Sequence, residues 1–209
     1  MPSIDPEPTS DSAATADPES TPIEPDEQSE QSEPAAARLP QRRARTLTAV
    51  LVGVALLVVA LDQVTKAWAQ SQFSDGDSIE LLGGWLTLTY TRNPGAAFNL
   101  GTGTTWVFTI IATVVVVVIL RASRQLGSLG WAIALGALLG GAMGNLLDRI
   151  FRDPGFLRGY VVDWIQVPHF PVFNIADSAI TCAAIGLVVL GLFGPDISGH
   201  RHGHTPEGS

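Results

Sequence analysis

The chain has 209 residues, of which 46% are hydrophobic and only 15% are charged, whereas about 25% of residues are charged in an average soluble domain. Its formal net charge of −8 is unevenly placed, because residues 1–37 hold ten acids without Lys or Arg, and all twelve basic residues follow. The single cysteine, Cys182, excludes an intramolecular disulfide and a cage of cysteine ligands for a metal.

The N-terminal segment, residues 1–37, is rich in Pro, Ser, Thr, Asp and Glu and has almost no large apolar side chains. Such a segment cannot bury enough surface to offset the entropy lost on ordering. It is acidic and lacks an apolar core, so it does not have the pattern of a cleavable signal peptide. We predict that residues 1–45 form a disordered acidic cytoplasmic tail with a basic end next to the membrane.

Four long apolar stretches follow the tail, at about residues 46–69, 104–120, 129–147 and 175–193. Each is close to the ~20 residues that a helix needs to cross a hydrocarbon core. A buried soluble bundle is the alternative, but four such runs with so few charges favour membrane helices. We therefore predict one membrane domain over residues 46–193 and a C-terminal tail over residues 194–209.

The placement of Lys and Arg predicts the orientation of these helices. Arg38, Arg42, Arg43 and Arg45 precede the first helix, and Arg121 and Arg124 link the second to the third. We therefore place both chain termini in the cytoplasm and the loops 70–103 and 148–174 outside. The protein is thus expected to be a multi-pass membrane protein.

The first outer loop contains a strand pattern, because Leu86, Leu88 and Tyr90 alternate with threonines. Glycines precede this run and Asn93-Pro94-Gly95 follows it, which are turn signals. The predicted fold class is an all-α integral membrane protein with four transmembrane helices and a small extracytoplasmic β-sheet and loop cradle.

Four aspartates lie near the outer ends of the predicted helices, and no inner end carries an acid: Asp62, Asp148, Asp163 and Asp177. Charged residues are costly inside a membrane, so a cluster at one depth indicates function. Asn174 is positioned to cap the fourth helix, which places Asp177 at its third position. Structural ion pairs are the leading interpretation for Asp148 with Arg149 and for Asp62 with Lys66, spaced i, i+4.

Two carboxylates that share one water cannot both ionise easily, so one retains a proton. The ionised carboxylate can activate the water, and the protonated one can bind a peptide carbonyl oxygen. Asp163 and Asp177 are the preferred pair, although Asp148 could replace Asp163. Gly-x-Ser-x-Gly and His-Glu-x-x-His motifs are absent, and His169 is the one histidine outside the C-terminal tail.

Five motifs in this order resemble those of the prolipoprotein signal peptidase family, also called signal peptidase II: DQVTK at 62–66, RNPGAAF at 92–98, GNLLDR at 144–149, VVDW at 161–164 and FNIADS at 173–178. The resemblance covers about residues 46–193 and implies a protein of the bacterial plasma membrane with its active site at the extracytoplasmic face. It implies an intramembrane aspartyl endopeptidase that removes the signal peptide of a diacylglyceryl-modified prolipoprotein, just before the lipid-modified cysteine.

The resemblance also implies the roles of individual residues. The catalytic aspartates map onto Asp163 and Asp177. The supporting or substrate-binding residues map onto Asp62, Lys66, Asn93, Gly95, Phe98, Asn145, Asp148, Arg149 and Asn174. No metal or cofactor is implied, and the expected partners are prolipoprotein substrates and membrane lipid. We expect a monomer with no nucleic-acid partner.

Two other interpretations remain open from the sequence. A small transporter or proton-coupled carrier could also use membrane aspartates, but it predicts acids through the whole membrane depth. A noncatalytic membrane scaffold would not require Asp163 and Asp177 to converge.

Overall fold

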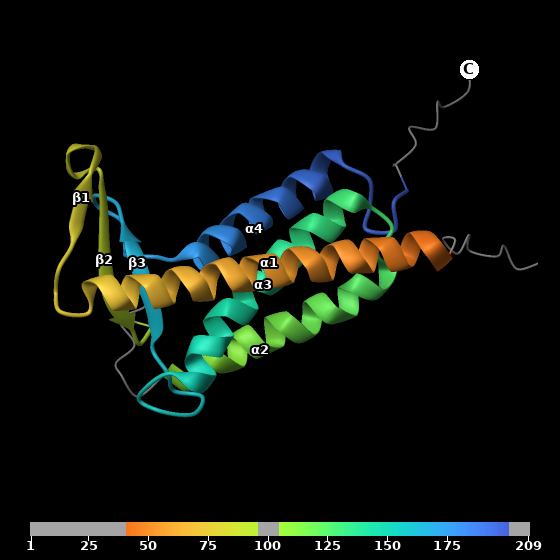
Figure 1. Cartoon of the computed structure of the whole chain (residues 1–209). Helices are drawn as coiled ribbons and strands as arrows, with labels where there is room; N and C mark the ends of the chain where they lie inside the picture. The colour runs from red at the N-terminus through yellow and green to blue at the C-terminus, as the bar shows by residue number, and fades with distance from the viewer. Residues whose placement is uncertain (1–40, 96–104, 201–209) are drawn as a thin grey trace, which may run out of the picture. The chain divides into compact units, whose positions relative to one another are not determined.

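The structure is a computed structural model that describes residues 41–95 and 105–200. Within these ranges, four helices are long and apolar enough to cross a membrane. Their bounds are α1, Gln41–Phe73; α2, Thr105–Ala122; α3, Leu129–Phe151; and α4, Ile175–Phe193. Figure 1 shows the four helices running side by side, with a small sheet at one end of them. We call this end of the helices the sheet end.

The helices confirm the prediction of four membrane spans, with changes at their ends. The first helix extends beyond the predicted 46–69 in both directions, to Gln41 and Phe73. Its 33 residues correspond to about 50 Å at 1.5 Å per residue, which exceeds the ~30 Å hydrocarbon core. The third helix continues past 147 to Phe151, so Asp148 and Arg149 lie inside its last turns.

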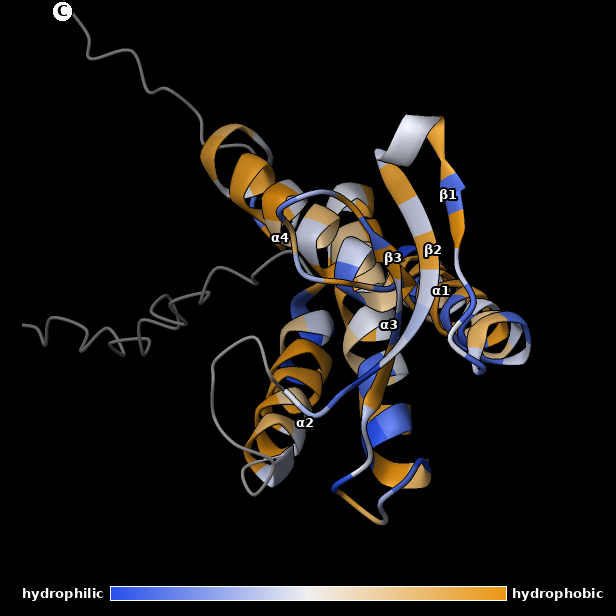
Figure 2. Cartoon of the chain, turned by 90° about the vertical axis from the view of Figure 1, so that its left-hand side faces the viewer, coloured by the Kyte–Doolittle hydropathy of each residue, from blue (hydrophilic) through white to orange (hydrophobic). Residues whose placement is uncertain are grey.

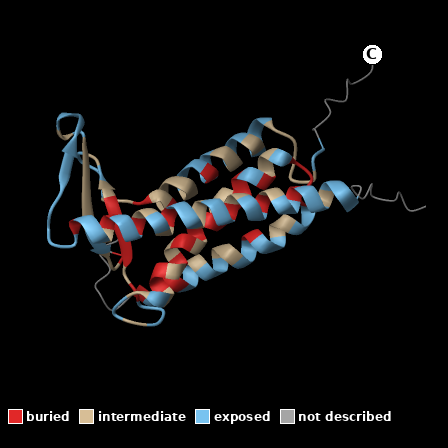
Figure 3. Ribbon diagram, in the orientation of Figure 1, coloured by how far each residue is buried: buried red, intermediate tan, exposed pale blue. Residues whose placement is uncertain are grey.

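The helices turn large apolar side chains outward, as spans in contact with lipid do. The exposed side chains include Val52, Leu56 and Leu57 of α1, Val114 and Val118 of α2, and Val188 and Leu192 of α4. Figure 2 shows how hydrophobic residues dominate the helices, and Figure 3 shows that the buried residues gather toward α3 and the sheet end. A lipid bilayer would cover these exposed apolar faces of the helices.

The third helix is the most buried of the four spans, because glycines let its neighbours approach closely. A Cβ atom on Gly140 would lie 2.7 Å from the Ala55 carbonyl oxygen of α1. A Cβ atom on Gly144 would lie 2.6 Å from Oδ2 of Asp62. The glycines of α3 therefore allow α1 to pack closely against it, and this packing brings polar residues of both helices together.

Three antiparallel strands form the sheet in the order β1-β2-β3: β1, Ile79–Leu81; β2, Leu86–Asn93; and β3, Val161–Gln166. The alternating run is confirmed as β2, and a short 3-10 helix, Leu82–Gly84, links it to β1. Thr91 of β2 lies opposite Asp163 of β3. The strand β3 was not predicted, because its first four residues are all buried and show no alternation.

An aromatic cluster fixes the sheet to the end of α1. The rings of Trp68 and Trp164 pack edge to face with their centroids 5.6 Å apart, and those of Trp68 and Phe73 are 5.4 Å apart. Such pairs add specific geometry to the burial of large apolar surface. The β3 strand, and Asp163 with it, is thereby held at a defined place next to α1.

Candidate active site

The start of α4 is held by a reciprocal cap. Oδ1 of Asn174 accepts a hydrogen bond from the backbone N–H of Asp177 at 2.9 Å. Oδ2 of Asp177 accepts one from the backbone N–H of Asn174 at 3.2 Å. This arrangement is a capping box, and it confirms that Asn174 caps the helix with Asp177 at its third position.

Asp163 lies in β3 with 2% of its surface exposed. Its Oδ1 accepts a hydrogen bond from the side-chain amide of Asn174 at 2.7 Å. Its Oδ2 accepts one from the side-chain amide of Asn93, at the end of β2, at 2.8 Å. One residue, Asn174, therefore contacts both candidate aspartates, through its side chain and through its backbone.

A second asparagine completes the connection between the two carboxylates. Asn145 of α3 donates from Nδ2 to Oδ1 of Asp177 at 2.8 Å, and its Oδ1 accepts from Nδ2 of Asn174 at 3.2 Å. Both oxygens of Asp177 thus accept N–H groups at the N-terminal end of a helix, where negative charge is favoured. The structure brings Asp163 and Asp177 into one polar network.

The pKa of Asp163 is raised to about 7. Burial away from water is the largest cause and the negative charge of Asp177 adds to it, while hydrogen bonds from Asn93 and Asn174 and the charge of Lys66 lower the pKa. Near neutral pH the carboxyl group of Asp163 is therefore present in both its protonated and its ionised form. A carboxyl group with a raised pKa beside a second carboxylate is the arrangement expected of an acid and base pair.

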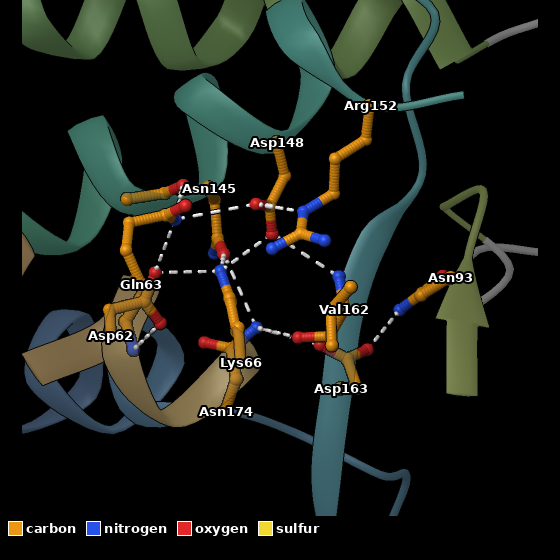
Figure 4. Close-up of polar contacts among 12 residues, drawn as sticks. Asp62, Gln63, Lys66, Asn93, Asn145, Asp148, Arg152, Val162, Asp163 and Asn174 are labelled. Atoms are coloured by element: carbon orange, nitrogen blue, oxygen red, sulfur yellow. Dashed lines mark hydrogen bonds and ion pairs between the residues drawn. The ribbon is translucent and has the colours of Figure 1, made fainter. Parts of the chain in front are cut away.

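A buried charged cluster supports this network from the side of α1. Nζ of Lys66 lies 2.7 Å from Oδ2 of Asp62 and 2.8 Å from Oδ2 of Asp148, and all three side chains have no exposed surface. It also donates to Oδ1 of Asn145 at 3.0 Å. Figure 4 shows Lys66 between these groups. The i, i+4 pair of Asp62 with Lys66 is confirmed.

The predicted ion pair of Asp148 with Arg149 is wrong. Asp148 is bound by Lys66 at 2.8 Å and by Nε of Arg152 at 2.6 Å. Its Oδ2 also accepts the backbone N–H of Val162 at 3.2 Å. Adjacent residues on a helix point about 100° apart, whereas residues four apart share a face. Asp148 therefore turns toward Arg152 and away from Arg149.

Arg149 instead turns toward α2, where its guanidinium lies 5.2 Å from the ring centroid of Phe108. Its Nη1 is buried and has no hydrogen-bond partner among residues 41–95 and 105–200. A buried guanidinium N–H group without an acceptor is costly, so it marks a place where a ligand oxygen can bind.

The turn after β2 is partly described. The backbone N–H of Gly95 donates to Oδ1 of Asn93 at 2.8 Å, and Gly95 has a φ of +108°, which favours glycine. This bond orients the Asn93 amide so that its nitrogen faces Asp163. The predicted substrate-binding residue Phe98 lies outside the described residues.

Two grooves adjoin the network. One of about 320 Å³ lies on the sheet side and is lined in part by Thr91, Asn93, Asp163 and Pro171. The other, of about 410 Å³, runs between helices and is lined mostly by apolar residues: Phe108, Ile111, Ala112, Val115, Leu138, Ala142 and Ile180. Asn145 and Arg149 form the polar part of this second lining.

Two members of the network were missed from the sequence. Gln63 donates from Nε2 to Oδ2 of Asp62 at 3.1 Å and to Oδ1 of Asp148 at 3.3 Å. Arg152 is spaced i, i+4 from Asp148, and this spacing could have revealed their pair. No such pattern marks Gln63. No group of three or more His, Cys, Asp or Glu side chains suited to a metal occurs among the described residues.

Comparison with known proteins identifies the family of the chain. A family model described as signal peptidase (SPase) II matches residues 54–193. A lipoprotein signal peptidase of Mycobacterium avium (strain 104) is 50% identical over 164 residues, covering 78% of this chain and 90% of the relative. One from Streptomyces coelicolor is also 50% identical over 164 residues, covering 78% of this chain and 80% of that protein.

Solved structures of bacterial membrane enzymes also resemble the chain. One, determined in meso at 1.9 Å resolution, has a TM-score of 0.62 and 32% sequence identity, covering 69% of this chain and 94% of its own. A second, at 2.3 Å resolution, has a TM-score of 0.59 and 31% identity, covering 69% and 88%. The match to the family model over residues 54–193 and the 50% identity to the two lipoprotein signal peptidases show that the chain belongs to the signal peptidase II family.

Proposed function

We propose that the chain is an intramembrane aspartyl endopeptidase. It removes the signal peptide from diacylglyceryl-modified prolipoproteins by cleaving just before the lipid-modified cysteine. The observation that carries this proposal is the sharing of Asn174 by Asp163 and Asp177, with the pKa of Asp163 raised to about 7. Membership of the family supports the substrate class.

In the proposed reaction, Asp177 is the ionised partner and Asp163 the protonated one. A water between them gives a proton to Asp177, and its oxygen forms a bond to the scissile carbonyl carbon. Asp163 gives its proton to the carbonyl oxygen, producing an uncharged tetrahedral intermediate. When the C–N bond breaks, the proton on Asp177 moves to the leaving amine and one hydroxyl proton returns to Asp163.

The helix groove supports binding of an apolar substrate segment in the membrane. Its apolar lining from α2, α3 and α4 suits hydrocarbon or a hydrophobic peptide, and Asn145 joins it to Asp177. The buried Nη1 of Arg149 is available for a peptide carbonyl oxygen. Binding energy from the apolar part would then position the scissile bond beside the aspartates.

Asp148 is a poorer partner for Asp177 than Asp163, because Lys66 and Arg152 already bind it. The transporter alternative predicts acids through the membrane depth. Instead, among the described residues, the buried aspartates Asp62, Asp148 and Asp163 all belong to the polar cluster at the sheet end. We further propose that the sheet end faces outward and that both termini are cytoplasmic.

The test uses the full-length chain in lipid vesicles with a purified diacylglyceryl prolipoprotein. Asp163→Asn and Asp177→Asn should each reduce kcat/KM by about 10²–10⁴-fold, the range for loss of an acid or base. Asp77→Asn, the same change at an exposed position, should keep the full rate. Normal cleavage by either dyad variant, with the protein folded, excludes the aspartyl mechanism. Mass analysis of the product identifies the cleaved bond.

A further inference from the structure

A polar cavity of about 150 Å³ lies beside β2 and the ends of α1 and α3, and its polar lining consists of Gln70, Tyr90, Arg92, Arg152, Asp153 and Tyr160. Side chains alternate between the two faces of a strand. Tyr90 and Arg92 therefore belong to one face of β2, and Asn93, which contacts Asp163, to the other. The lining of this cavity contains neither Asp163 nor Asp177. The cavity nevertheless adjoins their network, because Arg152 donates to Asp148 and Arg92 also lines the groove beside Asp163.

Two guanidinium groups are fixed in the cavity by their own hydrogen bonds. Arg152 donates from Nε to Asp148 at 2.6 Å and from Nη1 to Oε1 of Gln70 at 2.8 Å. Arg92 donates from Nε to the hydroxyl oxygen of Tyr90 at 2.8 Å. Each guanidinium carries five N–H donors. Their Nη2 groups make no hydrogen bond to residues 41–95 or 105–200.

Arg92 has no strong ion pair with the acids around the cavity. Asp62 and Asp148 are offset by Lys66 and Arg152. The carboxylate nearest to Arg92 is that of Asp153, at 3.8 Å from Nη1, and its side chain is 85% exposed. An exposed pair at this distance contributes little. An anion in the cavity can therefore bind Arg92 without breaking a strong interaction.

The cavity lies beside the C-terminal ends of α1 and α3. The 23 residues of α3 correspond to about 35 Å, so this helix ends close to the edge of a ~30 Å hydrocarbon core. Gln70 is in the last turn of α1, and Phe151 is the last residue of α3. Phe151 lines the cavity and is 77% exposed, as an apolar side chain in contact with lipid would be. Figure 3 shows the exposed segment that follows α3 at this edge. Lipid phosphate groups lie next to the hydrocarbon core, at this level.

We propose that this cavity binds the phosphate group of an anionic phospholipid. Fixed guanidinium forks are suited to phosphate, because they donate two parallel hydrogen bonds. The hydroxyl of Tyr160, which makes no hydrogen bond to the described residues, adds a donor. Phe151 would contact the acyl chains of the same lipid. The site does not depend on catalysis, so its test does not depend on the proposed reaction.

Binding of phosphatidylglycerol to the delipidated full-length protein in detergent tests the proposal, measured by native mass spectrometry. Arg92→Gln should weaken this binding about tenfold, as loss of a charge-assisted hydrogen-bonding group does. Arg158→Gln removes the same charge from an exposed residue between α3 and β3, and should change binding less than twofold. Arg92→Lys keeps the charge but loses the guanidinium fork, so its affinity for phosphatidylglycerol should lie between those of the other two variants.

Two further arms separate the source of the phosphate and the place of binding. Inorganic phosphate at millimolar concentration should leave phosphatidylglycerol bound if the lipid is the ligand, and should displace it if free phosphate is. Asp163→Asn should bind phosphatidylglycerol like the unchanged protein. Equal loss of phosphatidylglycerol binding in Arg92→Gln and Arg158→Gln would show that the lipid responds to the positive charge of the surface as a whole, and would overturn the proposal. Unchanged binding by folded Arg92→Gln would overturn it as well.

Discussion

Lys66 and Asn145 are in direct contact, with Nζ of Lys66 donating to Oδ1 of Asn145 at 3.0 Å. Because the amide oxygen faces the ammonium group, the amide nitrogen faces Asp177, to which it donates at 2.8 Å. The charge on Lys66 therefore sets the direction of the hydrogen bond that Asp177 receives. Lys66 acts on Asp177 through Asn145, as a positioning residue.

Replacing this ammonium group tests how far the cluster stabilises the fold. Lys66→Met leaves Asp62 and Asp148 buried without their shared cation. Loss of one partner from a buried charged cluster typically costs about 3–5 kcal/mol. We expect a matching loss of unfolding free energy in detergent, together with reduced cleavage. Arg45→Met, at an exposed position of the same helix, should change the stability little, and equal losses would contradict this role.

Asn174 has two separable roles, which two substitutions can distinguish. Asn174→Ala removes the helix cap and the donor to Asp163, so it should cost about 1 kcal/mol of stability and most of the activity. Serine also caps helices well, but its hydroxyl is shorter than the amide that reaches Asp163. Asn174→Ser should therefore keep most of the stability and lose activity. Thermal unfolding and cleavage rates measured on both variants check this, and an active serine variant would contradict it.

The raised pKa of Asp163 predicts how cleavage depends on pH. The protonated fraction of this carboxyl falls as pH rises through about 7, so kcat/KM should decrease above that value. Asn93→Ala removes a hydrogen bond that lowers the pKa, so the decrease should move to higher pH. Rates measured between about pH 5 and 9 on one lipidated substrate test both. A shift to lower pH in the variant would refute this assignment.

The same pKa has a consequence for stability. The unfolded carboxyl titrates near about 3.9, and the folded one near about 7. Between these values the folded chain holds a proton that the unfolded chain releases. The contribution of Asp163 to stability is therefore complete below about 4 and declines as pH rises toward 7. Asp163→Asn should remove this part of the pH dependence of unfolding.

Close packing of α1 and α3 can be tested with two glycines. A Cβ atom on Gly144 would lie 2.6 Å from Oδ2 of Asp62, whereas one on Gly53 would meet nothing within 4 Å. Gly144→Ala should destabilise the fold by about 1–3 kcal/mol through overpacking. Gly53→Ala should be neutral or slightly stabilising, because alanine favours the helix. Unfolding in detergent measures the difference, and similar effects of both changes would contradict the packing argument.

Several features of this chain could be predicted because they depend on local sequence. An apolar run of about 20 residues specifies a membrane span by itself, since backbone groups must be satisfied within the segment. The alternation of Leu86, Leu88 and Tyr90 specified the strand β2. The spacing of Asn174 and Asp177 was enough for the cap of α4, because both partners lie within one turn.

The pairing of Asp148 with Lys66 could not be predicted, because it depends on which helices meet. Asp148 has three nearby cations in sequence or space: Arg149, Arg152 and Lys66. The side-chain direction on α3 and the close approach of α1 select the last two. The same geometry turns Arg149 toward Phe108 of α2. Pairing with a distant residue such as Lys66 requires the packed structure.

The sequence by itself determined the four membrane spans and the cap of α4, because each depends on neighbours within a few positions along the chain. The tertiary structure alone decided that Asp163 is joined to Asp177 through Asn174, while Asp148 is neutralised by Lys66 and Arg152. Carboxylates of the same type acquire different chemistry from burial and from the groups that reach them. Those groups come from five parts of the chain that only folding brings together: α1, β2, α3, β3 and the start of α4.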